Sequence, residues 1–205
     1  MRKTKIIKID KNSPDEKTIQ FAAGVLKQGG LVAFPTETVY GIGANFLNDE
    51  AMKKLRDIKK RHPQKPFTLN IASLDTIKEM QCEVPFLAER LIKNFWPGPL
   101  TIILKSKDGK IGFRMPKNNI AKSVILKSGV PVALPSANLS GEKPATSCDE
   151  ISHALDEKID LILDGGSTEL GRESTVVEVV GASCKILREG TLPRSKIEEV
   201  CSALL

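Results

Sequence analysis

Polar side chains that could bind a substrate come directly after apolar segments at several points of the chain. The segment PTETVYGIG at 35–43 follows the apolar residues 31–34, and PSAN at 135–138 follows the apolar residues 130–134. Ligands bind near the ends of strands in open α/β sheets, so both segments are candidate parts of one site. A turn in which Thr36 and Thr38 bond to backbone groups explains the first segment about equally well.

Cationic side chains are the second feature that could do chemistry. They gather in KKRHPQK at 59–65, and Arg114 and Arg188 each lie near the end of a further apolar segment. Guanidinium and ammonium groups suit phosphate and carboxylate oxygens. A solvated helix end explains residues 59–65 without any ligand, and a surface strand does the same for Arg114.

The sequence lacks the signatures of several common enzyme classes. Residues 164–175 are rich in glycine and hydroxyl groups and could bind an anion through backbone N–H groups. No GK[ST] or GxSxG motif occurs, and the only histidines are His62 and His153. Cations, hydroxyls and an amide without an obvious nucleophile favour a nucleotide-handling enzyme that works by positioning and charge neutralisation.

Length and composition limit the kinds of partner. A chain of 205 residues, 40% of them hydrophobic, can form one domain with a sizeable core. Its net charge of +6 is compatible with anionic partners, whereas an aromatic content of 4% argues against extended stacking on single-stranded nucleic acid. The four cysteines form no C-x-x-C pair, and we predict no metal bound by protein side chains.

The sequence gives no sign of a targeting or membrane segment. The first residues lack the apolar core of a signal peptide, and no apolar run approaches the roughly 20 residues of a membrane span. We therefore expect a cytoplasmic protein without membrane contact.

Strand-like and helix-like patterns alternate along the chain and predict an α/β fold in a single domain over residues 1–205. Capping boxes at Ser13 and Ser147 and a cap at Asn48 predict three helix starts, and the prolines after Trp96 must end another helix there. A last helix carries Ile197. Strands are predicted at 31–34, 100–104, 111–115, 130–134, 160–163, 176–180 and 185–187.

Taken together, the ordered motifs resemble those of the YrdC-like family of L-threonylcarbamoyladenylate synthases in its short, single-domain form. The match runs from about residue 29 to residue 190. The motifs are PTETVYG (35–41), KxR (59–61), WPGPLT (96–101), RxP (114–116), PSAN with SG (135–141), STV (174–176) and RxG (188–190). The resemblance implies a twisted, mixed α/β open sheet flanked by helices around a concave basic cavity.

The resemblance also implies a reaction. ATP, L-threonine and bicarbonate would give threonylcarbamoyl-AMP and pyrophosphate, with Mg²⁺ accompanying the nucleotide. The adenylate would pass to tRNA threonylcarbamoyl-transfer proteins as the first step of a tRNA modification, and contact with tRNA or double-stranded RNA is compatible with this role.

Site residues follow from the same resemblance, position by position. The nucleotide-binding positions are Lys59, Arg61, Lys65, Lys110, Asn138, Thr146 and Arg188. The threonine-binding positions are Thr38, Asn70, Arg114, Ser136 and Ser174. Glu37 and Glu173 are candidates near Mg²⁺, although we predict no protein ligand to the metal.

Two positions depart from the family pattern. Many relatives carry histidine where this chain has Asn70, and Asn70 can donate and accept hydrogen bonds but cannot titrate. His62 stands where proline usually follows Arg61. The extra C-terminal domain of longer members is expected to be absent.

Two alternatives remain open. A basic module of the same fold could bind RNA without catalysis, which a net charge of +6 permits. A related domain of hydrogenase-maturation proteins forms a carbamoyl adenylate from carbamoyl phosphate. That alternative ranks third, because 205 residues without C-x-x-C leave no room for the acylphosphatase-like domain and zinc motifs of those proteins.

Overall fold

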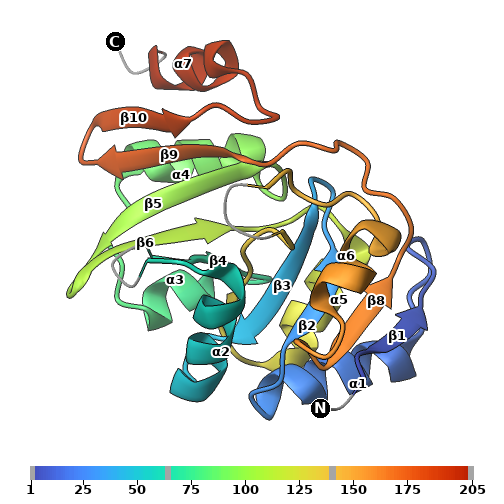
Figure 1. The fold of residues 1–205 in the computed structure, drawn as a ribbon. Helices are drawn as coiled ribbons and strands as arrows, with labels where there is room; N and C mark the ends of the chain where they lie inside the picture. The colour runs from blue at the N-terminus through green and yellow to red at the C-terminus, as the bar shows by residue number, and fades with distance from the viewer. Residues whose placement is uncertain (1–2, 63–65, 139–141, 203–205) are drawn as a thin grey trace.

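The computed structural model describes residues 3–62, 66–138 and 142–202, and Figure 1 shows their arrangement. Within these ranges ten strands form one mixed sheet in the order β1-β8-β2-β3-β7-β4-β6-β5-β9-β10. Their bounds are β1 Lys5–Lys8, β2 Val32–Pro35, β3 Tyr40–Asn45, β4 Thr68–Asn70, β5 Leu100–Ser106, β6 Gly109–Arg114, β7 Val132–Ala133, β8 Leu161–Asp164, β9 Thr175–Val180 and β10 Ser183–Arg188. The expected mixed α/β fold is confirmed.

Helices pack on the sheet and at its end. Their bounds are α1 Glu16–Lys27, α2 Asp49–Lys59, α3 Asp75–Glu79, α4 Phe86–Phe95, α5 Asn119–Ser128, α6 Cys148–Leu155 and α7 Arg194–Ser202. Helix α7 lies beside the β9–β10 end of the sheet and contacts α4 (Figure 1). No helix in the described part of the chain is both long and apolar enough to cross a membrane.

Side chains that alternate along the strands divide the apolar interior into two clusters. In β2, Val32 and Phe34 pack against α1 and α5, whereas Ala33 faces the larger cluster beneath α2, α4 and α6. This is the period of two expected when both faces of a sheet are covered. The sheet is therefore fixed from both sides, which keeps the ends of its strands in place.

Two of the three predicted helix starts, at Ser147 and Asn48, are confirmed in position, whereas the start predicted at Ser13 is wrong. Helix α1 is capped by Asp15 rather than Ser13, because the Asp15 carboxylate accepts from Thr18 N at 2.8 Å. An ionised cap also complements the helix dipole, which a serine hydroxyl does not. At α6, Ser147 holds the cap position without a side-chain hydrogen bond. The cap of α2 by Asn48, which accepts from Ala51 N at 2.9 Å, is confirmed.

Several elements were not predicted. Strand β3 begins at Tyr40, inside the segment 35–43, and β2 and β3 pair antiparallel across residues 36–39. Strands β1 and β4 and helices α3 and α5 were not predicted either. The predicted hairpin around Gly109 is confirmed as the antiparallel pair β5–β6.

The register of the central strands brings many polar strand ends together. Strands β4 and β6 are parallel and end side by side, with Asn70 opposite Arg114. Strand β5 runs antiparallel to β6, so its first residues lie beside Arg114, and the parallel pair β5–β9 brings the start of β9 to the same end. One edge of the sheet thus gathers residues that are far apart in the sequence.

Candidate functional site

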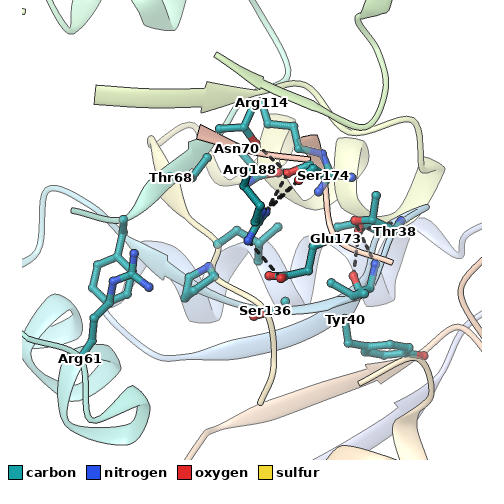
Figure 2. Close-up of a pocket in the computed structure, with 17 residues that line it drawn as sticks. Thr38, Tyr40, Arg61, Thr68, Asn70, Arg114, Ser136, Glu173, Ser174 and Arg188 are labelled. Atoms are coloured by element: carbon teal, nitrogen blue, oxygen red, sulfur yellow. Dashed lines mark hydrogen bonds and ion pairs between the residues drawn. The ribbon is translucent and has the colours of Figure 1, made fainter. Parts of the chain in front are cut away.

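A cavity opens where these strand ends meet. It has about 640 Å³ of space without protein atoms, part of it open to solvent. Its walls come from the 36–41 turn, the ends of β4 and β6, the starts of β5 and β9, the 134–136 segment and Arg188 (Figure 2). The predicted residues that line it are Thr38, Arg61, Asn70, Arg114, Ser136, Ser174 and Arg188.

The 36–39 turn is a hydroxyl-capped turn, as one interpretation of the sequence proposed. The Thr36 hydroxyl donates to Val39 O at 2.7 Å and accepts from Thr38 N at 3.2 Å. The Thr38 hydroxyl lies 2.8 Å from the Thr36 hydroxyl and is fully buried in the wall of the cavity. The turn is therefore compatible with both interpretations of the sequence. Its hydroxyls form hydrogen bonds to backbone groups, and they also lie in the wall of the cavity, where a ligand could bind.

Arg114 is buried and needs an anion, and the structure supplies one. Its Nη2 lies 2.8 Å from Glu37 Oε1, and the two side chains are only 8% and 3% exposed. Its Nε donates to Gly98 O at 3.3 Å. Among the described residues, neither Glu37 oxygen has a hydrogen-bond partner of good geometry, so charge rather than a well-aligned hydrogen bond holds the pair. A surface position for Arg114 is therefore wrong.

Asn70 is the second buried polar residue at this end of the cavity. Its side chain comes from the last residue of β4, and the residue is 2% exposed. Its Oδ1 has no hydrogen-bond partner within the described part of the chain. Because an unpaired buried acceptor is costly, a ligand or water that donates a hydrogen bond here would be favoured.

Arg188 reaches the cavity from the end of β10 and binds the start of β9. Its Nε and Nη2 donate to Ser174 O at 3.2 and 2.9 Å. The Ser174 hydroxyl is 2.8 Å from the Thr101 hydroxyl. Arg188 Nη1 forms an ion pair with Glu173 Oε2 at 3.0 Å. These contacts fix the guanidinium at the cavity wall, as Figure 2 shows.

Gly190 allows this close approach between the start of β9 and the end of β10. A side chain at this position would overlap the backbone of Glu173 and Ser174. The glycine of the RxG motif therefore has a steric role, which places Arg188 against Ser174.

Lys59 lies behind the cavity wall rather than in the cavity. Its Nζ donates to Ser136 O at 2.6 Å, to Asn138 Oδ1 at 3.0 Å and to Asn138 O. Burial, followed by the nearby charge of Arg61, lowers the pKa of Lys59 to about 8. The ammonium group thus organises the 136–138 segment, in which the Ser136 hydroxyl donates to Asn138 Oδ1 at 2.5 Å.

Arg61 lies at the opposite side of the cavity from Arg188 (Figure 2). Its Nη2 donates to Pro66 O at 2.6 Å, and its guanidinium stacks 4.8 Å from the centre of the Phe67 ring. Burial is the main cause that lowers the pKa of Arg61, and the neighbouring charges of Arg56 and Arg188 act in the same direction. A half-buried guanidinium beside other cations favours the arrival of an anion.

The structure does not bring every predicted nucleotide residue to the cavity. Lys110 lies near the start of β6, at the other end of this strand from Arg114, and is paired with Glu178. Thr146 bonds to Glu150 through its N at 2.7 Å and its hydroxyl at 3.1 Å, and neither Thr146 nor Asn138 lines the cavity. Lys65 lies outside the described residues. Two of the cations that do line it, Arg114 and Arg188, are paired with carboxylates, so a basic cavity stays a prediction.

Sequence reasoning missed several residues of the cavity wall. Thr68 and Thr101 line it from β4 and β5. Glu37, which pairs with the wall residue Arg114, was considered only as a neighbour of a metal. The fully buried Tyr40 donates to Gly166 O at 2.7 Å, which ties the start of β3 to the glycine-rich segment. Thr101 could have been found, because it is a polar residue inside an apolar strand.

No group of three His, Cys, Asp or Glu residues in the described ranges could hold a metal ion.

Comparison with known proteins identifies the family. The model of the Sua5/YciO/YrdC family, described as "Telomere recombination", matches residues 24–190, and the chain belongs to this family. A threonylcarbamoyl-AMP synthase of Pyrococcus abyssi is 41% identical over 196 residues, which are 91% of this chain and 58% of that protein. A relative from Methanocaldococcus jannaschii is 35% identical over 95% of this chain and 97% of its own length.

The fold agrees with solved structures of the family. The crystal structure of P. abyssi Sua5 complexed with L-threonine superimposes with a TM-score of 0.91, at 41% identity, over 96% of this chain and 61% of that one. The family resemblance read from the motifs is therefore confirmed. The chain spans 58% of the length of the P. abyssi relative and of a Bacillus subtilis relative.

Proposed function

We propose that this protein is an L-threonylcarbamoyladenylate synthase, a nucleotidyltransferase that converts ATP, L-threonine and bicarbonate into threonylcarbamoyl-AMP and pyrophosphate. The observation that carries the proposal is the convergence of all five predicted threonine-binding residues in one cavity of a Sua5-family fold. The name of the P. abyssi synthase and the threonine in its solved structure support the same function.

The amino acid is proposed to bind at the Arg114 end of the cavity. Arg114 is held by Glu37 and Gly98 and can direct its remaining N–H groups at the substrate carboxylate. Asn70 Oδ1, which has no partner among the described residues, accepts a hydrogen bond from the substrate hydroxyl or amino group. Hydroxyls of Thr38, Ser136 and Ser174 complete a polar wall that can orient a small amino acid.

The triphosphate is proposed to bind between Arg61 and Arg188, which line different sides of the cavity (Figure 2). Both guanidiniums are anchored by backbone carbonyls, so they are oriented before the anion arrives. We propose that Mg²⁺ enters with ATP, bound by phosphate oxygens and water. Lys59 supports this end indirectly, since it fixes the backbone on either side of Ala137.

The proposed chemistry needs positioning and charge neutralisation rather than a protein nucleophile. The amino nitrogen of threonine attacks the carbon of carbon dioxide derived from bicarbonate and loses a proton, which gives a carbamate. A carbamate oxygen then attacks the α-phosphorus of ATP, and the bond to the β-phosphate oxygen breaks to release pyrophosphate. Negative charge develops on the leaving pyrophosphate, and fixed guanidiniums stabilise it.

The remaining features of the role are proposals of the same kind. Residues 1–205 form a single domain, which the continuous ten-stranded sheet supports. The adenylate passes to tRNA threonylcarbamoyl-transfer proteins in the cytoplasm. A role as an RNA-binding module without catalysis is less favoured, because the polar residues of the motifs line a cavity rather than a flat surface. Replacement of bicarbonate by carbamoyl phosphate as the carbon donor is the third candidate.

Arg61→Ala tests the nucleotide end of the proposal, with Arg56→Ala as its matched control. Both arginines stack on Phe67, with guanidinium-to-ring distances of 4.8 and 5.4 Å, but only Arg61 lines the cavity. Loss of a charge-assisted phosphate contact worth roughly 2–4 kcal/mol should slow pyrophosphate release about 30- to 1000-fold in Arg61→Ala.

Arg56→Ala should retain most of the wild-type rate, because its side chain does not face the substrate. Equal rates in both folded variants would remove Arg61 from the site. Salt-sensitive RNA binding by a wild-type protein that never releases pyrophosphate would favour the RNA-binding alternative.

A further inference from the structure

The carboxylate of Glu173 occupies the end of the cavity proposed for the triphosphate. It lies in the cavity wall and forms an ion pair with Arg188, with 3.0 Å between Oε2 and Nη1. Its side chain is 33% exposed and points into the open space (Figure 2). A negative side chain is therefore present at the place where the proposed substrate carries most of its negative charge.

Glu173 acts on more than one cation. Burial lowers the pKa of Lys59 and of Arg61, and in each case the charge of Glu173 opposes that effect. Together with the direct contact to Arg188, this carboxylate lies within electrostatic reach of three cations. Like a bound anion, it offsets part of the repulsion among cations that the fold holds together.

Only the side chain of Glu173 is free to move away. Its backbone carbonyl accepts from Thr191 N at 2.9 Å and from the Thr191 hydroxyl at 3.2 Å, and Gly190 packs tightly against it. Arg188 would not lose its place if the carboxylate left, because two of its nitrogens bind Ser174 O. A rotation of the Glu173 side chain alone can therefore release the Arg188 guanidinium.

We propose that Glu173 is a positioning residue that serves as the counterion of Arg188 in the nucleotide-free protein and gives up this ion pair when the triphosphate binds. The proposal deepens the proposed function and rests on it, because it concerns the nucleotide end of the same cavity. A carboxylate that stayed beside Arg188 would repel the phosphate oxygens. ATP binding consequently has to replace an existing ion pair, which lowers the affinity for nucleotide and eases the departure of pyrophosphate.

Glu173→Gln removes the charge and keeps the size of the side chain. Because the pair is partly exposed, the loss of competition should strengthen Mg-ATP binding by about 3- to 10-fold. Glu173→Asp keeps the charge and should bind Mg-ATP nearly as wild type does. Glu83→Gln is the matched control, since it removes the carboxylate of an exposed ion pair with Lys105 that lies outside the cavity.

The experiment measures the Kd for Mg-ATP by calorimetry and the KM for ATP from threonine-dependent pyrophosphate release. A lower Kd and a lower KM in Glu173→Gln, with Glu173→Asp and Glu83→Gln at wild-type values, support the proposal. An unchanged or weaker affinity in Glu173→Gln overturns it, as does a rise in the Mg²⁺ concentration needed for binding. The calorimetric result stands even if wild type releases no pyrophosphate, so failure of the proposed function is recognised separately.

Discussion

The buried ion pair between Glu37 and Arg114 leads to a prediction that depends on the fold alone. The two side chains are 3% and 8% exposed, and their closest atoms are 2.8 Å apart. Glu37→Gln removes the charge of the partner and leaves a buried guanidinium that donates to the Gly98 carbonyl at 3.3 Å. Removal of one partner from a buried pair typically costs about 3–5 kcal/mol, so Glu37→Gln should lower the free energy of unfolding by that amount.

A double-mutant cycle separates the pair from other effects. Urea unfolding of wild type, Glu37→Gln, Arg114→Met and the double variant should give a coupling of about 2 kcal/mol or more, because the second substitution removes the charge that the first leaves unpaired. The exposed pair Lys105–Glu83, at 3.3 Å, is the control and should couple by less than about 1 kcal/mol. Additivity within about 0.5 kcal/mol for Glu37 and Arg114 would refute the reasoning.

Three further predictions concern the supporting residues. Burial lowers the pKa of Lys59 from 10.5 to about 8, so between these pH values the unfolded chain holds a proton that the folded chain has lost. Wild type should therefore gain stability relative to Lys59→Met as the pH rises from about 8 to about 10.5; unfolding midpoints in urea that change in parallel would contradict this. Gly190→Ala should cost at least about 1–3 kcal/mol, because the new methyl group overlaps backbone, whereas Gly24→Ala in α1 has open space and should stabilise by about 0.5–1 kcal/mol; equal melting temperatures would count against the steric argument. Asn70→Ala should raise the KM for L-threonine about 5- to 30-fold and the KM for ATP by less, because Asn70 Oδ1 lacks a partner among the described residues and is available to the amino acid. Steady-state kinetics measures both values. An equal rise in both KM values would mean that Asn70 acts on the cavity as a whole.

The sequence predicted those parts of the fold that depend on local pattern. The β5–β6 hairpin, the end of α4 at Trp96 and the cap of α2 at Asn48 each follow from a few adjacent residues. Strand β4 is only three residues long and carried no clear signal. Helix α5 was missed although Asn118 caps its start and Gly129 follows its end. Their places are determined by pairing with strands and helices that are distant in the sequence.

The site shows the same limit. The residue pattern alone allowed a surface position for Arg114 and gave no sign that Glu37, which is distant in the sequence, would be its buried partner. Lys59 is a stronger example, because two of its three acceptors are backbone carbonyls, which any residue type could supply. The five residues that the resemblance assigns to threonine line one cavity, and their role stays a prediction. Lys110 instead pairs with Glu178, because β6 lies beside β5 and β5 lies beside β9.

The central claim is that the protein joins bicarbonate carbon, threonine and AMP in one product. The most direct measurement incubates the purified protein with Mg-ATP, L-threonine and ¹³C-labelled bicarbonate and examines the nucleotide products by mass spectrometry. The account predicts an AMP derivative that contains threonine and is heavier by one mass unit than the product from unlabelled bicarbonate. A nucleotide product without the label would contradict it. So would unchanged ATP as the only nucleotide, if the protein is folded and binds ATP.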